Sequence, residues 1–268
     1  MEPEKVQRAL ISAFDNAQVT AHFNNEIADM AKTTHDIRKR FEDISRELRD
    51  FDNLHYRKQD GSRVDHLYPT WEGYYERYMT LLRDSQKDAL DFKFICEDYL
   101  EMVIPALEDR GSHPEELKDI ANDYKQRTMP HERTSKFYGE AFEALSHNLT
   151  QFKQAIQNAL VDAEKGIDTQ ISRGIVQDLK ALISKHRDVV HVTPVTDSIV
   201  ATVNAFAYFW KAINSDTELM ISKLDSAIAA RTDCGTFLMR KGLSEKGVAS
   251  LYTALQQAVL HYTFEPNA

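Results

Sequence analysis

The sequence predicts an all-α fold, an elongated antiparallel bundle of long helices. Turn residues are scarce: the 268 residues include 9 Gly and 7 Pro, against the roughly 12% that these two types usually contribute. This scarcity argues against sandwiches, barrels and doubly wound α/β folds, which need frequent turns. Hydrophobic residues make up 42% of the chain, which is enough for a sizeable core. Apolar positions also recur with a 3.5-residue period in four long stretches, as in packed amphipathic helices.

The clearest of these periods lies in the first fifth of the chain. Its apolar positions alternate in spacings of four and three, and charged residues fill the places between them. This pattern is typical of a long amphipathic helix with a narrow apolar seam. We expect that helix at about 18–54, preceded by a short one at about 4–15. The seam consists of Phe23, Ile27, Met30, Thr34, Ile37, Phe41, Ile44, Leu48 and Phe51.

Turn and cap residues divide the rest of the chain. The run Asp60-Gly61-Ser62 indicates a turn, and Thr70 is the expected N-cap of the next helix. Pro105 should kink or fray the end of that helix, and Met129-Pro130 should interrupt a later one. We therefore expect three further long helices at about 70–108, 132–190 and 197–231, and shorter ones at about 114–128 and 244–262.

The third long helix carries a change of period. Between Ala163 and Ile175 the apolar spacing becomes three successive fours, a stutter that locally unwinds a supercoil. Gly166 and Gly174 lie in this stretch, so we expect a bend or a close contact there. The joins between helices are short, which makes sequential helices antiparallel neighbours. The whole chain, 1–268, is predicted to be a single domain.

Charge and termini exclude several classes of partner and location. Lys and Arg number 33 against 42 Asp and Glu, a net charge of −9, and no basic block is longer than Arg38-Lys39-Arg40. Binding to nucleic acid and passive attraction to anionic lipid are therefore not expected. The start, 1–5, lacks the basic and apolar parts of a signal peptide, and no run of about 20 apolar residues suits a membrane-spanning helix. We expect a cytoplasmic protein.

Motifs for chemistry are missing. The chain has no glycine-rich phosphate loop, no Glu-x-x-His, no His-Glu-x-x-His and no Gly-x-Ser-x-Gly. We therefore predict no catalytic, cofactor-binding or metal site and no enzyme activity. Cys96 falls on a seam and should be an inert core thiol, whereas Cys234, beside a glycine, should lie in a turn. His55 and His66 flank the Asp60-Gly61 turn and could meet at one end of the bundle.

One segment stands apart, the 22 residues Val189–Trp210, whose only formal charge is Asp197. Pro194 interrupts it, so a stable transmembrane helix is not expected. One interpretation is a helix corner followed by a core helix. The other is a segment that is buried in water and released onto a membrane. The candidate lipid-contacting residues are Val195, Ile199, Val200, Val203, Phe206, Tyr208, Phe209 and Trp210.

With its long heptad helices and the apolar corner Val189–Trp210, the chain resembles cytolysin A-type α-helical pore-forming toxins. These are soluble bundles that keep an apolar tongue or hairpin at one end until they meet a membrane. The run Asp15–Ala21 is also similar to that of cytosolic fungal proteins of this general shape. The resemblance implies a non-enzymatic protein that associates with membrane lipid after a conformational change. The alternative is a coiled-coil scaffold or oligomerising module that binds another helical protein, or itself, without membrane activity.

Overall fold

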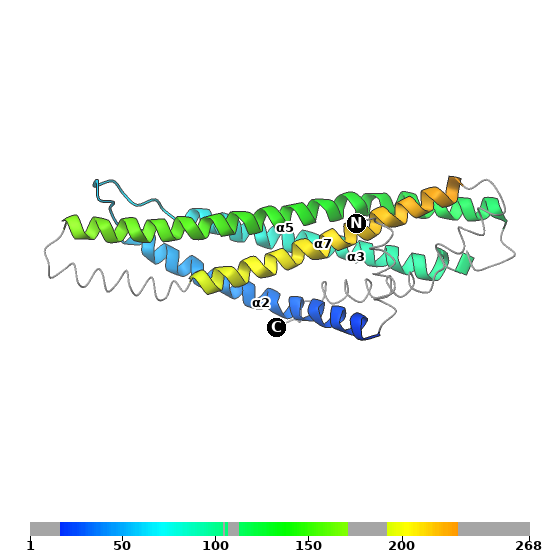
Figure 1. The fold of residues 1–268 in the computed structure, drawn as a ribbon, viewed down its shortest axis with the longest axis horizontal. Coiled ribbons are helices and arrows are strands. Elements are labelled where there is room, and N and C mark those ends of the chain that lie inside the picture. The colour runs from blue at the N-terminus through cyan, green and yellow to red at the C-terminus, as the bar shows by residue number, and fades with distance from the viewer. Residues whose placement is uncertain (1–16, 104, 107–112, 171–191, 230–268) are drawn as a thin grey trace. The chain divides into compact units, whose positions relative to one another are not determined.

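The structure is a computed structural model that describes residues 17–103, 105–106, 113–170 and 192–229 (Figure 1). The described part is built from helices, with one isolated β-bridge between Arg57 and Arg63 and no strand. The predicted all-α class is therefore confirmed. The α-helices are α2 (Ala17–Asn53), α3 (Tyr68–Asp98), α5 (Pro114–Gln170) and α7 (Val192–Ala229), and a π-helix, η1 (Tyr99–Val103), follows α3.

Two of the predicted helices are close to those observed. The expected helix at 18–54 corresponds to α2, which begins and ends one residue earlier. The helix expected at 197–231 corresponds to α7, which begins five residues earlier. Pro194 therefore lies in the first turn of α7, where a missing N–H removes no intrahelical bond. The predicted helices 4–15 and 244–262, the end of the predicted helix 132–190, Gly174 and Cys234 lie outside the described residues.

The predicted break at Met129-Pro130 is wrong, because α5 continues through Pro130. The helices expected at 114–128 and 132–190 are thus one element as far as Gln170. A proline inside a helix costs about 3 kcal/mol, and packing on both sides offsets that cost. The buried Tyr124 donates a hydrogen bond from its hydroxyl to the Ile95 carbonyl (3.1 Å). His131 packs edge-on against Phe92, with ring centroids 6.0 Å apart.

The third element predicted from the sequence, a helix at 70–108, also differs from the structure. Its α-helical part, α3, ends at Asp98, and the wider π-turn of η1 follows. This change of geometry lies shortly before Pro105, which has no N–H to donate to the preceding turn. Tyr99 and Val103 are both buried in η1, and the Tyr99 ring lies 5.5 Å from that of Tyr124. The π-turn thus keeps two apolar side chains in the core.

The connection between α2 and α3 is an ordered turn. Its second residue, His55, has a positive φ of 51°, and the His55 N–H donates a hydrogen bond to the Asp52 carbonyl (3.2 Å), as at many helix C-termini. The predicted turn at Asp60-Gly61-Ser62 is confirmed. Asp60 Oδ1 accepts hydrogen bonds from the Ser62 N–H (2.9 Å) and hydroxyl (2.6 Å), and Gly61 has a φ of 85°, which favours glycine.

The N-terminus of α3 is capped by a residue of α2. The buried Asp52 carboxylate accepts hydrogen bonds from the N–H groups of Leu67 (3.0 Å) and Tyr68 (2.9 Å). The prediction of Thr70 as the N-cap is wrong, since Thr70 is the third residue of α3 and is exposed. A carboxylate at this position satisfies free N–H groups and complements the helix dipole. The cap joins the end of one helix to the start of the next.

Gly166 of α5 is a close contact point, as the stutter suggested. A Cβ on Gly166 would lie 1.7 Å from the Arg57 carbonyl oxygen, a distance that no side chain permits. The turn that follows α2 therefore packs directly on the backbone of α5. Glycine is required here by space rather than by its own dihedral freedom.

The chain divides into two compact units, and each of the described α-helices contributes a segment to both. The prediction of one domain is not tested by this division. Within unit 2, Phe41 is central: its ring lies 4.9 Å from Trp71 and 5.2 Å from Tyr78. The Trp71 indole N–H also donates to the Phe41 carbonyl (3.1 Å). Unit 1 consists of residues 1–32, 83–139 and 208–268, and unit 2 of residues 33–82 and 140–207.

Candidate interaction surface on α7

The solvent-facing side of α7 is uncharged between two exposed charged residues, Asp197 and Lys211. No Asp, Glu, Lys or Arg occurs in the thirteen residues 198–210. Within α7, spacings of four, three and four place Ala201, Ala205, Tyr208 and Ala212 on one face of the helix. Ala201, Tyr208 and Ala212 are exposed and Ala205 is partly exposed, and Tyr208 is the most open at 71%. We call the face formed by these four residues the outer face of α7.

Most of the predicted lipid-contacting residues lie on the opposite, buried side of α7. Of the eight, Tyr208 is the one whose side chain is exposed rather than buried or partly exposed. Core packing therefore accounts for the inner face of this helix, and contact with lipid stays a prediction for these residues. Val195 and Val200 are partly exposed, whereas Ile199, Val203, Phe206, Phe209 and Trp210 are buried.

In unit 2, α7 is held by two aromatic contacts and two polar ones, and one of the aromatic contacts joins Phe206 to Tyr78 of α3, with ring centroids 6.4 Å apart. The Phe206 ring lies 5.4 Å from that of Phe142 in α5. Asp197, the single charge of the segment, is paired with Lys153 of α5 at 2.7 Å. The Arg40 guanidinium of α2 donates a hydrogen bond to the Ser198 hydroxyl. The pair with Lys153 neutralises Asp197, the charged residue that directly precedes the uncharged stretch.

In unit 1, α7 packs on α5 through Trp210. Its ring lies 4.9 Å from that of Tyr138, and the Tyr138 hydroxyl donates to Asp88 of α3 (2.6 Å). Further along, the Ser135 hydroxyl donates to the side-chain oxygen of Asn214 (3.3 Å). Within unit 1, α7 thus contacts α5 through both Trp210 and Asn214.

A carboxyl group missed by the sequence analysis lies near the core of unit 1. Asp216 is only partly exposed, and burial raises the pKa of its carboxyl to about 7. The thiol of Cys96 is fully buried, and burial, with smaller effects from the negative charges of Asp216 and Glu97, raises its pKa well above the usual value. The prediction of Cys96 as a core thiol is therefore confirmed. The sequence indicated the location of Asp216 only indirectly, because this residue directly precedes Thr217, which lies on the apolar seam of the helix.

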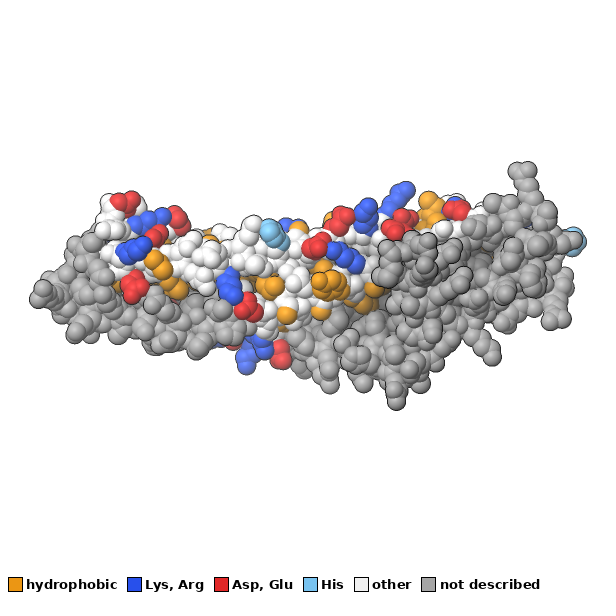
Figure 2. All heavy atoms as spheres, in the orientation of Figure 1, with side chains coloured by type: hydrophobic (Ala, Val, Ile, Leu, Met, Phe, Trp, Pro, Cys, Tyr) orange, Lys and Arg blue, Asp and Glu red, His pale blue; other side chains and the backbone are white. Residues whose placement is uncertain are grey.

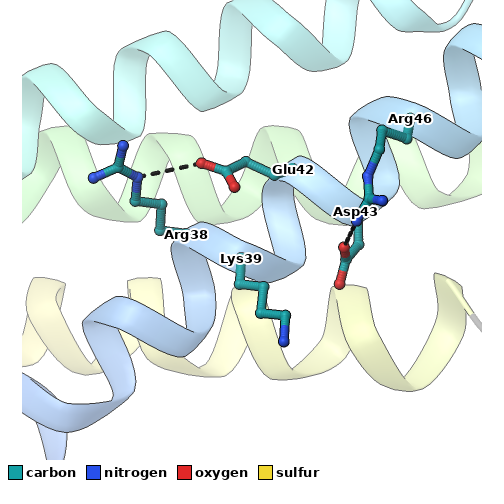
Figure 3. Close-up of a pocket in the computed structure, with 5 residues that line it drawn as sticks. All are labelled: Arg38, Lys39, Glu42, Asp43 and Arg46. Carbon is teal, nitrogen blue, oxygen red and sulfur yellow. Dashed lines mark hydrogen bonds and ion pairs between the residues drawn. The ribbon is translucent and has the colours of Figure 1, made fainter. Parts of the chain in front are cut away.

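The charged residues of α2 line a shallow hollow of about 410 Å³ (Figure 3). Figure 3 shows Arg38 and Glu42 beside α3, while Lys39 points toward α7. Glu42 accepts a bond from Arg38 (3.3 Å), and Asp43 pairs with Arg46. Two of the three cations are therefore neutralised within the hollow, which is a poor arrangement for binding phosphate. Figure 2 likewise shows cationic and acidic side chains in neighbouring groups on the face it presents.

The two predicted loop histidines do meet. The ring centroids of His55 and His66 are 6.1 Å apart, and both residues are exposed. Among the described residues, no group of three or more His, Cys, Asp or Glu side chains could hold a metal ion. His147 is exposed and contacts Gln151 through its Nε2 (2.8 Å).

Comparisons with known proteins identify no relative. No protein-family model, no curated protein and no solved structure matches the chain. A search of the described helices for one long and apolar enough to cross a membrane likewise finds none.

Proposed function

We propose that this chain is a non-enzymatic helical protein that associates with membrane lipid, and that α7 makes the first contact through its outer face. One observation carries the proposal: the outer face of α7 is uncharged and exposes Tyr208. Core packing explains why the inner face is apolar, but it does not explain an uncharged outer face. A tyrosine suits the boundary between headgroups and acyl chains, because its ring is apolar and its hydroxyl polar.

The charge of the protein favours zwitterionic lipid over anionic lipid. The net charge is −9, and an anionic surface would repel a chain of this sign. The hollow on α2 does not reverse this preference, because Glu42 and Asp43 neutralise two of its cations. We therefore expect binding to phosphatidylcholine vesicles that weakens when anionic lipid is added.

The inner face of α7 supplies a second step. If α7 separates from α5, Ile199, Val203 and Phe206 become available to acyl chains, as the resemblance to pore-forming toxins implies. Separation breaks the Lys153–Asp197 pair and removes Phe206 from Phe142. An exposed ion pair contributes little, about 0–1 kcal/mol, so the aromatic core is the main barrier. Lipid would have to bury a comparable apolar area.

Vesicle co-sedimentation and dye release test the proposal together. Tyr208→Asp places a charge on the outer face of α7 without entering the core, and it should abolish binding to phosphatidylcholine vesicles. Ala155→Asp, at an exposed position of α5, is the matched control and should bind like the unmodified chain. Binding of Tyr208→Asp at the unmodified level would exclude the outer face of α7. Binding without dye release would exclude only the second step.

A second function, binding of another helix, is favoured by α3. Leu90 and Phe94 are one turn apart on that helix and are exposed at 40% and 57%. Such i, i+4 apolar pairs are typical anchors for a partner helix. Light scattering over a range of concentrations tests this alternative with the protein itself as partner. A dimer that Phe94→Asp dissociates, in a chain that does not bind vesicles, would establish the scaffold function in place of the membrane one.

A further inference from the structure

We propose that His55 and His66 together bind a late first-row divalent cation such as Ni²⁺ or Zn²⁺. The two imidazoles come from opposite ends of the turn between α2 and α3, and both are exposed. Neutral imidazole nitrogen is a preferred ligand of these ions. Two protein ligands hold the cation, and water completes its coordination shell.

The spacing of the two rings suits one shared ion. A cation at about 2.0–2.1 Å from one nitrogen of each ring would place the ring centroids about 5–6.4 Å apart, from tetrahedral to linear arrangement. The observed separation is 6.1 Å, with ring planes inclined by 37°. The separation of the two ring centroids is therefore already within the range that one shared cation requires.

Asp52 holds the backbone of both histidines in place. Its carbonyl accepts the N–H of His55 (3.2 Å), and its carboxylate accepts the N–H of Leu67, the residue after His66 (3.0 Å). One buried residue thus anchors both ends of the turn. A site whose ligands are positioned by fixed backbone loses less conformational entropy when it binds a cation.

Asp52 also lies in the place of an outer-shell carboxylate. Its Oδ2 is 3.9 Å from His66 Nδ1, and metal-bound histidines commonly donate their second N–H to such a group. A modest shift of the ring would complete that bond and leave Nε2 for the cation. The neighbouring Lys58 is engaged by Asp65 at 3.2 Å, so its charge is compensated within the turn.

Thermal unfolding of the 268-residue chain with and without NiCl₂ or ZnCl₂ tests the site. Saturating metal should raise Tm by about 2–4 °C. His55→Asn, which tolerates a positive φ, and His66→Gln should each abolish that rise. His147→Gln, at an exposed histidine of α5, should keep it. Equal unfolding temperatures of all variants in EDTA would show that the turn still folds.

Calorimetric titration with Ni²⁺ should give one binding event per chain, weakened at least tenfold in His55→Asn and in His66→Gln. The proposal is overturned by any of three results: no metal-dependent shift in Tm, a shift that survives both substitutions, or a shift that His147→Gln also removes. None of these results bears on vesicle binding, so this site and the proposed membrane function succeed or fail separately.

Discussion

The helices α2 and α7 follow the same inner pattern but differ on their outer faces. Both place an apolar residue toward the core every three or four positions, and Phe41 of α2 and Phe206 of α7 are both fully buried. On α2 the side facing solvent is charged nearly throughout residues 36–50, whereas on α7 residues 198–210 carry no charge. The period explains burial in both helices. The difference lies on the outer faces, which packing does not constrain, and it is there that we expect evidence of binding.

The largest expected effect tests whether the inner faces are equivalent. Phe41→Ala and Phe206→Ala each remove a buried aromatic ring, and each should lower the free energy of unfolding by about 3–5 kcal/mol. Urea unfolding followed by circular dichroism measures both. A loss below about 1 kcal/mol for Phe206→Ala alone would show that α7 is loosely packed, and the comparison of the two helices would then have to start from their cores.

The next expected effect is a pH dependence of the free energy of unfolding that arises from α7 and not from the seam of α2. The described seam of α2, from Ile37 to Phe51, carries no titratable group, whereas α7 carries Asp216, whose pKa rises from 3.8 to about 7 in the folded protein. The folded state therefore binds more protons than the unfolded state between these values. The contribution of Asp216 to stability should be greatest below about pH 4, fall as the pH rises, and level off above about pH 7.

The expected loss across that range is about 2 kcal/mol, less than the full shift implies because Asp216 is partly exposed. Unfolding titrations at several pH values measure it, and Asp216→Asn should remove this component of the slope. A slope that is unchanged in Asp216→Asn would assign the pH dependence to other groups.

Substitution of Tyr208 should have a small effect on stability and a large effect on binding to vesicles. Tyr208→Asp should change the free energy of unfolding by less than about 0.5 kcal/mol, as is usual for exposed positions, yet it should eliminate binding to vesicles. Chemical unfolding and vesicle co-sedimentation on the same preparations measure the two quantities. If instead stability fell by several kcal/mol, Tyr208 would be a core residue, and the outer face of α7 would lose its main support.

The smallest effect concerns the charged face of α2. Arg38→Met removes the exposed pair with Glu42, in which both side chains are at least half exposed. It should lower the free energy of unfolding by about 0.3–0.5 kcal/mol at low salt and by less at high salt. Vesicle binding should not change, because this face has no part in the proposed contact. A loss of binding in Arg38→Met would move the lipid contact from α7 to α2.

Local periodicity was sufficient to locate α2 to within one residue at each end. The reason is that its seam, from Phe23 to Phe51, repeats without interruption and its end is marked by a turn. The same kind of local pattern wrongly predicted a helix end at Pro130. A proline indicates that a helix would be locally destabilised, but it gives no information about the packing of Tyr124 and His131 that offsets this cost. The cap of α3 was missed for a similar reason: Asp52 lies fifteen residues before Leu67 in the chain.

For the candidate surface, the sequence identified the segment and the exposed Tyr208, but most of the other residues that it indicated lie on the buried side of α7. The scarcity of charge in 189–210 was visible, yet it drew attention to Ile199, Val203 and Phe206, which are buried. A heptad pattern predicts which positions form the buried face of a helix, but it does not distinguish among the remaining positions. Ala201 and Ala205, small residues between the seam positions, gave no signal until burial showed that the outer face of α7 includes them.

Local sequence patterns were sufficient to predict the helical class, the inner face of the long helices, the turn at Asp60-Gly61-Ser62 and the core position of Cys96. These properties depend on interactions between residues a few positions apart, or on the composition of one helical turn. Four other features became visible only in the folded chain: Asp52 caps α3, Gly166 admits the Arg57 carbonyl, the rings of His55 and His66 lie close together, and Asp216 is partly buried. Each of these depends on contacts between segments distant in the chain, which no local pattern encodes.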